Sequence, residues 1–208
     1  MRRVALSGLD FYPTPSWVTE ALLEVEGFRG TILEPACGDG AISKVLAAAN
    51  YEVESSDLYD RGYGTDNRDF LLSIASGYHW PINNIVTNPP YNFAEKFILR
   101  ALEITKYKVA FFLRLAFLES ITRHNSIFKE TPPTRVWVFS ERVTMYPNGQ
   151  QTAGSGTTAY AWFIWEASNG DFTRGKTTSL GWIPPGSKPK ARKRERPALG
   201  LRLSDLGL

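Results

Sequence analysis

Apolar residues recur along most of the chain in two patterns. Apolar positions three or four residues apart are typical of amphipathic helices, and short apolar runs between turn residues are typical of buried strands. The first pattern predicts helices over 16–26, 41–49 and 93–104. The second predicts strands over 31–33, 51–56, 84–87, 109–113, 136–139 and 159–165. Because these strands alternate with helices, we expect an α/β fold with a mostly parallel central sheet flanked by helices.

The pattern changes after residue 166, where proline and glycine become frequent and apolar residues become scarce. Such a composition is typical of loosely ordered segments. We therefore divide the chain into a folded domain over residues 1–166 and a Pro/Gly-rich and basic C-terminal tail over residues 167–208. Leu180, Trp182 and Ile183 leave open the alternative that part of this tail docks on the domain.

The net charge of +3 is unevenly distributed along the chain. Residues 188–196 hold six basic residues and the single acid Glu195, so this segment carries +5 and the rest of the chain carries −2. A basic segment suits contacts to nucleic-acid phosphates, which add affinity without sequence preference. A solubilising or sorting tail is the alternative.

Composition also excludes several classes of protein and site. No stretch reaches the roughly 20 apolar residues that span a bilayer, so we expect a soluble, cytoplasmic protein that makes no membrane contact. The one cysteine, Cys37, excludes an internal disulfide and every multi-cysteine metal site. His79 and His124 lie far apart in the sequence, so we expect no metal site.

The first strand-ending turn is rich in glycine and acids. Ligands of parallel sheets bind beyond the carboxyl ends of the strands, which is where this turn lies. Its glycines permit a tight turn and a close approach of ligand to backbone, and its acids suit a positively charged ligand. The pattern differs from the dinucleotide fingerprint, and a purely structural turn is the alternative. The turn consists of Glu34, Pro35, Ala36, Cys37, Gly38, Asp39 and Gly40.

Two further acidic positions suit a nucleoside. Asp57 ends the second predicted strand, where an acid can accept both hydroxyl hydrogen bonds of a ribose. Asp60 is its rival, and a solvated loop carboxylate is the alternative for either residue. Asp69 followed by Phe70 can meet the amino group and the ring face of an adenine, although a helix-capping acid beside a core aromatic explains the pair equally well.

The most specific feature follows the strand predicted over 84–87. Asn88, Pro89, Pro90 and Tyr91 come directly after this strand. The prolines fix the backbone and leave carbonyls without neighbouring N–H donors. Asn88 adds a side-chain carbonyl and Tyr91 a ring face. Two acceptor oxygens beside an aromatic ring can hold a planar amino group such as N6 of adenine.

The run Asn88–Tyr91 resembles the NPPY catalytic motif of S-adenosylmethionine-dependent amino methyltransferases. The turn Glu34–Gly40 resembles their cofactor motif, with Asp57 and the Asp69–Phe70 pair at the expected later positions. The run Phe11–Pro15 is similar to the N-terminal segment that DNA adenine-N6 methyltransferases place ahead of the Gly-rich turn; a helix start with proline is its alternative. The likeness extends from about residue 10 to residue 166.

The resemblance implies a Rossmann-like class I methyltransferase fold whose last strand is antiparallel. It implies S-adenosylmethionine as cofactor, held by the turn together with Tyr12, Thr14, Asp57, Asp69 and Phe70. The implied reaction is transfer of the methyl group to N6 of an adenine in DNA, with no metal and no covalent enzyme intermediate. Because a paired base cannot reach such a pocket, base flipping is expected. Cys37 lies in the cofactor turn, where we interpret it as a small packing residue.

Candidate nucleic-acid contacts lie further along the chain. Arg114 and Phe117 follow the strand predicted over 109–113 and either touch nucleic acid or support the pocket. The loop over 144–158 is rich in amides, which read adenine edges, and a plain disordered loop is its alternative. The residues assigned to nucleic acid in this loop and in the tail are Asn148, Gln150, Gln151, Lys188, Lys190, Arg192, Lys193, Arg194 and Arg196.

Our leading hypothesis is a compact DNA adenine-N6 methyltransferase of a phage-like or orphan type. An RNA-base N-methyltransferase is the first alternative, so RNA remains a candidate partner beside DNA. A protein-glutamine N5-methyltransferase is the second, because such enzymes also use NPPY on a side-chain amide. A non-enzymatic nucleic-acid-binding relative is the third. The choice of DNA over RNA rests mainly on the run Phe11–Pro15.

Overall fold

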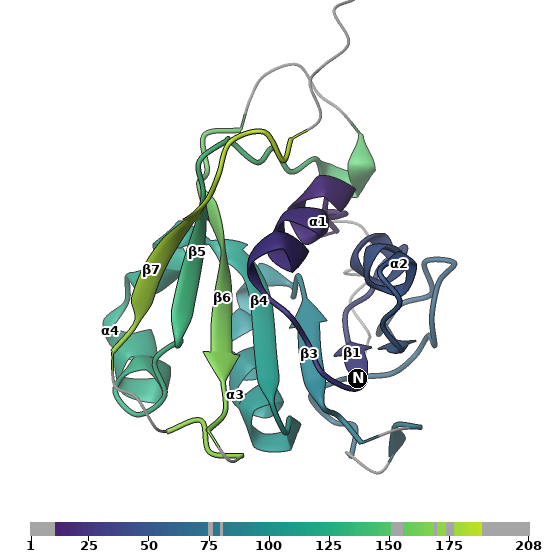
Figure 1. The fold of residues 1–208 in the computed structure, drawn as a ribbon. Helices are drawn as coiled ribbons and strands as arrows, with labels where there is room; N and C mark the ends of the chain where they lie inside the picture. The colour runs from purple at the N-terminus through teal and green to yellow at the C-terminus, as the bar shows by residue number, and fades with distance from the viewer. Residues whose placement is uncertain are drawn as a thin grey trace, which may run out of the picture.

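The computed structural model describes residues 11–74, 77–79, 81–150, 156–168, 170–173 and 177–188. Its centre is a seven-stranded sheet with helices on both faces (Figure 1). In the order in which they lie side by side, the strands are β2 (Val53–Ser55), β1 (Ile32–Glu34), β3 (Asn84–Thr87), β4 (Lys108–Arg114), β6 (Tyr160–Glu166), β5 (Arg135–Phe139) and β7 (Ser179–Ile183).

The strand directions confirm the predicted fold class. The strands β2, β1, β3 and β4 run parallel, and β6 runs antiparallel to both of its neighbours. All six strands predicted from the sequence are present with small shifts at their ends, and the last of them, β6, is the antiparallel strand.

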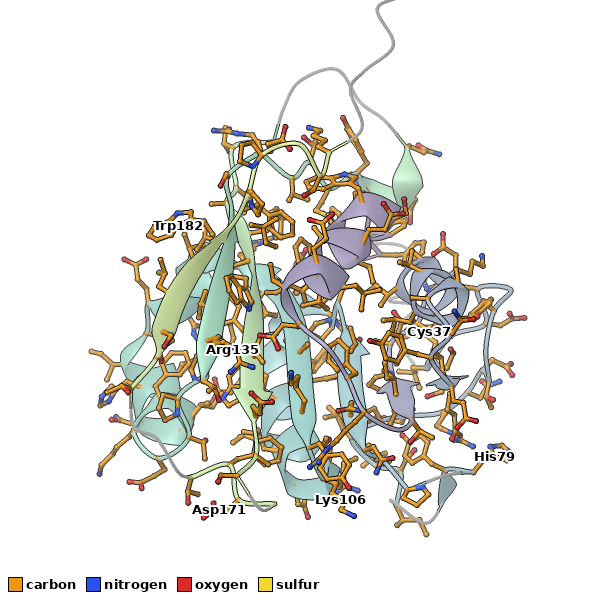
Figure 2. All side chains as sticks on the ribbon, viewed as in Figure 1. Cys37, His79, Lys106, Arg135, Asp171 and Trp182 are labelled. Carbon is orange, nitrogen blue, oxygen red and sulfur yellow. The ribbon has the colours of Figure 1, made fainter. Side chains whose placement is uncertain are left out.

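The seventh strand, β7, lies in the segment that the sequence analysis assigned to the tail. It pairs in parallel with β5 from Ser179 to Ile183, so the sheet extends past the predicted domain boundary at residue 166. Only Ile183 is buried, while Leu180 and Trp182 are 50 % and 63 % exposed. Figure 2 shows Trp182 at this edge of the sheet. Because an edge strand with a solvated face lacks a clear apolar pattern, pairing with β5 decides its structure.

The described residues contain four α-helices, one before the first strand and three between strands. They are α1 (Ser16–Val25), α2 (Ala41–Ala48), α3 (Ala94–Ile104) and the single turn α4 (Ile121–Arg123), which continues into a π-helical turn over His124–Phe128. Short 3₁₀ turns cover Tyr91–Phe93, Leu115–Leu118 and Pro147–Gly149. The fold is therefore a three-layer arrangement with α1 and α2 on one face of the sheet and α3 on the other (Figure 1).

Alternate residues of β4 fill the two halves of the core. Phe111 and Leu113 point toward the layer that contains α3, and Ala110 and Phe112 point toward the layer of α1 and α2. All four are essentially inaccessible to solvent. An apolar run that is buried on both faces is the pattern of a central strand in an α/β sheet.

A buried group of charges ties the end of α1 to the sheet. The Glu26 carboxylate accepts hydrogen bonds from Lys108 Nζ at 2.6 Å, from Arg135 Nε at 2.5 Å and from Trp137 Nε1 at 2.8 Å. Burial alone would raise the pKa of Glu26, but hydrogen bonds from Arg135, Lys108 and Trp137 outweigh it and hold the pKa below its ordinary value. These contacts fix α1, and with it the residues that precede α1, relative to β4 and β5.

Candidate active site

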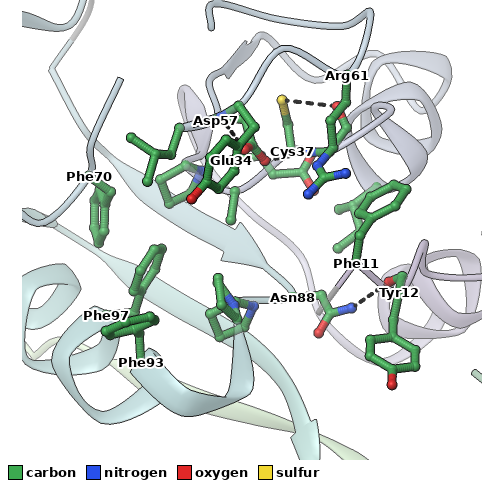
Figure 3. Close-up of a pocket in the computed structure, with 18 of the residues that line it drawn as sticks. Phe11, Tyr12, Glu34, Cys37, Asp57, Arg61, Phe70, Asn88, Phe93 and Phe97 are labelled. Carbon is green, nitrogen blue, oxygen red and sulfur yellow. Dashed lines mark hydrogen bonds between the residues drawn. The ribbon is translucent and has the colours of Figure 1, made fainter. Parts of the chain in front are cut away.

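A cavity of about 380 Å³ opens at the carboxyl ends of β1, β2 and β3. This is the edge of a parallel sheet at which ligands bind, and the volume suits a small-molecule ligand. Figure 3 shows side chains from several separate segments converging on it. Its lining includes the predicted residues Tyr12, Thr14, Glu34, Pro35, Ala36, Gly38, Asp57, Asp69, Phe70, Asn88, Pro89, Pro90 and Tyr91.

Gly40 is the one predicted cofactor residue outside this lining. It precedes α2 with φ +80°, and a Cβ here would lie 2.5 Å from the ring of Tyr63. Left-handed backbone and close packing therefore explain this glycine. The local structure therefore requires a glycine here, whether or not Gly40 takes part in the cofactor contact predicted for it.

Glu34 is the last residue of β1 and the first residue of the turn. The side chain is buried, and one carboxyl oxygen accepts hydrogen bonds from the backbone N–H and the hydroxyl of Ser43 in α2. Burial raises the pKa of Glu34 well above its ordinary value, and the negative charges of Asp57 and Asp39 add to that rise. A positive charge brought into the cavity would favour the ionised form again.

Asp57 lines the cavity, and both of its carboxylate oxygens accept hydrogen bonds from the backbone. Oδ2 accepts the backbone N–H of Gly38 at 2.9 Å, and Oδ1 accepts that of Tyr59 at 2.9 Å. Its rival Asp60 accepts the backbone N–H of Gly62 and lies outside the cavity lining. Asp57 is therefore the acid that a ligand would meet, and it comes to the site already hydrogen-bonded to the protein.

The Asp69–Phe70 pair lies in a turn beside the cavity. Asp69 Oδ1 accepts the backbone N–H of Leu71 at 3.0 Å in an Asx turn, and no helix begins at this residue. The Phe70 ring is almost fully buried, with its centroid 5.0 Å from that of Phe97, and both rings line the cavity. Figure 3 shows Phe70, Phe93 and Phe97 together at one side of the cavity. They form an apolar, aromatic wall that suits a flat ring system.

Asn88 has the most distinctive surroundings in the cavity. Its Nδ2 donates to the backbone oxygen of Tyr12 and to the hydroxyl oxygen of Thr14, each at 3.1 Å. Figure 3 shows the first of these hydrogen bonds. A backbone carbonyl only accepts hydrogen bonds, so this contact fixes which end of the amide faces Tyr12. The Oδ1 atom is buried and has no hydrogen-bond partner among the described residues. An oriented acceptor without a partner therefore lies at the cavity.

Tyr91 lies among aromatic and cationic neighbours. Its ring centroid is 6.0 Å from that of Tyr12 and 6.4 Å from that of Tyr160. The guanidinium carbon of Arg114 lies 4.4 Å from the Tyr91 ring centroid, a cation–π contact. Of the two interpretations left open for Arg114, support of the pocket matches this position.

The segment Phe11–Pro15 crosses the cavity beside the turn. The ring of Phe11 packs so closely on Gly38 that a Cβ there would lie 2.4 Å from Phe11 Cε2. The guanidinium carbon of Arg61 lies 4.2 Å from the Phe11 ring centroid and also lines the cavity. Arg61 makes no hydrogen bond or ion pair with the residues that the structure describes, so its donors are available to a ligand. Sequence reasoning singled out the run that begins at Phe11 but missed Arg61, Phe93 and Phe97, because only the folded chain brings them to the cavity.

Cys37 is a packing residue, as expected from the sequence. The thiol is buried beside the carbonyl oxygen of Tyr63. Burial raises its pKa to about 12, with Glu34 and Asp57 adding to the effect. A thiol of this kind does not act as a nucleophile at neutral pH.

The residues predicted to contact nucleic acid differ in their burial and in whether the structure describes them. Phe117 is half-buried, and its ring packs against Phe128 and Phe163 in the core. Asn148 and Gln150 are exposed in the turn after Tyr146, and Asn148 N donates to the backbone oxygen of Phe11 at 2.8 Å. Lys188 Nζ donates to the backbone oxygen of Arg142. Outside the described residues lie Gln151, Lys190, Arg192, Lys193, Arg194 and Arg196.

The described part of the chain lacks two features, a metal-binding cluster and a membrane-spanning helix. No group of three or more His, Cys, Asp or Glu side chains there is arranged to hold a metal ion. No helix in the described ranges has the length and apolar character that crossing a membrane requires.

Comparison with known proteins gives matches at the level of structure alone. No protein-family model matches the sequence, and no curated protein sequence matches it. A modification subunit assigned to a type I restriction enzyme of Vibrio vulnificus YJ016 has a TM-score of 0.55 and 14 % identity, over 91 % of this chain and 49 % of that one. The M protein of the type I restriction enzyme EcoKI has a TM-score of 0.53 and 14 % identity, over 81 % and 46 %.

A protein named as a hemolysin from Lactococcus lactis has a TM-score of 0.55 and 9 % identity, over 80 % of this chain and 91 % of its own. The chain therefore spans about half the length of the two modification subunits and most of the length of this third protein. At such identities the likeness concerns the fold. The chain has the Rossmann-like α/β fold that these proteins share.

Proposed function

We propose that this protein transfers the methyl group of S-adenosylmethionine to the exocyclic N6 amine of an adenine in DNA. The observation that carries the proposal is the amide of Asn88. Its nitrogen is committed to Tyr12 and Thr14, and its buried oxygen has no partner among the described residues. A buried acceptor without a partner is costly, so a donor brought by a substrate would be bound with a favourable free energy.

The residues around Asn88 support an amine as that donor. Adenine N6 is a poor nucleophile because its lone pair is delocalised into the ring. Asn88 Oδ1 and the carbonyl oxygen of Pro89 would each accept one amine hydrogen, which orients the amine and favours a tetrahedral nitrogen. Tyr91 would stack on the flipped base. Catalysis of this kind depends on positioning and electrostatics, which the rigid Asn-Pro-Pro backbone suits.

The cavity fits S-adenosylmethionine, which supplies the electrophilic methyl group when bound. The aromatic wall of Phe70 and Phe97 suits the adenine ring, and Asp57 suits the ribose. Asp39 Oδ1 is buried without a partner among the described residues and suits a positively charged group. Gly38 lets a ligand approach the backbone of the turn. These residues would bind the cofactor and hold it beside Asn88.

Two of the structures with this fold are modification subunits of type I restriction enzymes, which supports DNA as the methyl acceptor. RNA bases and protein glutamine also present planar amino groups. They are therefore the outcomes against which the proposal is tested.

The test is a methyl-transfer assay with tritiated S-adenosylmethionine and the full chain. Duplex DNA, single-stranded DNA, RNA and a glutamine-containing protein are offered in parallel, and the labelled product is digested and identified. We expect N6-methyladenine from DNA. Label only in RNA or in protein would contradict the proposed substrate, and no label in any acceptor would contradict the proposed reaction.

The matched variant is Asn88→Ala, with Asn125→Ala as control because Asn125 is exposed and does not line the cavity. Loss of one positioned electrostatic contact lowers turnover by about 10²- to 10³-fold, and we expect a fall of that order for Asn88→Ala with most cofactor affinity retained. Undiminished turnover in Asn88→Ala would contradict the role of this amide.

A further inference from the structure

The contact between Thr14 and Asn88 links two elements that are far apart in the sequence. Thr14 precedes α1, and Asn88 follows β3. Both acceptors of the Asn88 Nδ2 group, the Thr14 hydroxyl oxygen and the Tyr12 carbonyl oxygen, lie in the segment before α1. The orientation of the Asn88 amide therefore depends on where this segment is held.

The segment is held firmly. Thr14 is 4 % exposed and lies between Pro13 and Pro15, and each proline restricts both its own φ and the residue before it. Directly after Pro15 comes α1, whose Val18 and Leu22 are fully buried in the core. The Thr14 hydroxyl is thus a fixed acceptor and not one at the end of a mobile loop.

The opposite orientation of the Asn88 amide would be unproductive. It would turn Oδ1 toward the Tyr12 carbonyl oxygen, which cannot donate, and turn the NH₂ group into the cavity, where the donor hydrogens of a substrate amine would meet further donors. The Tyr12 carbonyl opposes this rotation because it only accepts hydrogen bonds, and the Thr14 hydroxyl adds a second hydrogen bond that holds Nδ2 in place. Removal of one of the two leaves the amide less well oriented without emptying the cavity.

We infer that Thr14 is a positioning residue, whose hydroxyl anchors the Asn88 amide in the orientation set by the Tyr12 carbonyl, with Oδ1 facing the substrate amine. The inference rests on the proposed function for its catalytic consequence and on the hydrogen bonds of Asn88 for its structural part. It differs from the role that the sequence resemblance implied for Thr14, which was contact with the cofactor.

The decisive variant is Thr14→Val, which removes the hydroxyl and keeps the shape of the side chain. Thr14→Ser retains the hydroxyl, and Thr14→Ala removes the same acceptor with less bulk. The matched control is Thr19→Val, because Thr19 is also buried and lies outside the cavity lining. Each variant is checked for folding by thermal unfolding.

A hydrogen bond of this kind contributes about 0.5–1.5 kcal/mol, which corresponds to about a three- to tenfold change. We expect kcat to fall by about three- to tenfold in Thr14→Val and Thr14→Ala, with the Kd for S-adenosylmethionine within about twofold of the wild type. Thr14→Ser and Thr19→Val should retain the wild-type kcat. An unchanged kcat in Thr14→Val, or a rise in the Kd for the cofactor with kcat unchanged, would overturn the inference.

A second measurement separates this inference from the proposed function. The side-chain NH₂ resonances of Asn88 in the free, ¹⁵N-labelled protein are assigned by their loss in Asn88→Asp. They should move in Thr14→Val and stay in place in Thr19→Val, whatever substrate the enzyme uses. Unmoved resonances in Thr14→Val would overturn the positioning role even if DNA is methylated. A protein that methylates no DNA but shows the shift would contradict the proposed function alone.

Discussion

Replacement of Gly38 by alanine tests how the turn and the segment before α1 are packed together. Gly38 has φ +55°, and a Cβ at this position would lie 2.4 Å from Cε2 of Phe11. Ordinary contacts between carbon atoms are about 3.5–4.0 Å, so the Phe11 ring must move by about 1 Å. The backbone of Phe11 accepts a hydrogen bond from Asn148, and the next residue, Tyr12, accepts one from Asn88.

Two costs follow from this geometry. A non-glycine residue in the left-handed region costs about 1–2 kcal/mol, and the displaced ring adds about 1–3 kcal/mol of overpacking. We therefore expect Gly38→Ala to lower the free energy of unfolding by about 2–5 kcal/mol. Because a misplacement of 1 Å can cost about a hundredfold in rate, turnover should fall as the Tyr12 carbonyl moves away from Asn88.

Chemical denaturation and single-turnover methyl transfer measure the two effects. Gly170→Ala is the matched control, since Gly170 also has positive φ but its Cβ would meet no atom within 4 Å. This control should lose only the backbone cost and keep full turnover. In a Phe11→Ala background, Gly38→Ala should cost no more than about 1–2 kcal/mol, because no ring remains to be displaced. Equal costs of Gly38→Ala in both backgrounds would refute the packing argument.

Three further predictions concern single residues of the cavity. Burial raises the pKa of Cys37 to about 12, so the native protein at pH 8 should resist iodoacetamide and react only when unfolded; rapid labelling of native protein would contradict this. Arg61→Gln should weaken binding of S-adenosylhomocysteine by about ten- to a hundredfold and leave binding of 5′-methylthioadenosine unaffected, because only the first ligand carries a carboxylate that the guanidinium can bind. Equal weakening of both ligands would exclude Arg61 as the group that binds this carboxylate. Burial raises the pKa of Glu34 above its ordinary 4.5. The protonated carboxyl group therefore contributes fully to the free energy of unfolding below pH 4.5, and this contribution is lost as the pH rises through the raised pKa of the folded state. Glu34→Gln should flatten this dependence in unfolding experiments across the neutral range, and parallel curves for the two proteins would contradict the assignment.

The sheet was predictable wherever a strand is buried on both faces. The apolar run of β4 and the short strand β3 have boundaries close to those predicted, because every residue in them except Arg114 is buried. The strand β7 was missed because one buried side chain, that of Ile183, does not make a pattern. Its structure depends on pairing with β5, a contact about forty residues away in the sequence that no local signal encodes.

Positions at the cavity were predictable where they closely follow the end of a strand. Asn88 comes directly after β3 and Asp57 shortly after β2, and the topology of a parallel sheet brings such positions together. Arg61 and Phe97 carry no such signal, since an arginine in a loop and a phenylalanine in a helix are ordinary residues until the fold places them on one cavity. The hydrogen bonds from Asn88 to Tyr12 and Thr14 span more than seventy residues and required the structure.

The hydrogen bonds of the acidic residues at the cavity show that most of them have a structural role. The sequence places Glu34, Asp39, Asp57 and Asp69 near one another, which by charge alone suggests strong attraction for a cationic cofactor. Three of the four carboxylates accept backbone N–H groups and hold the walls of the cavity in place. Asp39 differs, because its Oδ1 is buried without a partner among the described residues. A cationic group in this cavity would therefore find at Asp39 a buried carboxylate oxygen that no described residue satisfies, whereas Asp57 uses both of its oxygens to hold the backbone.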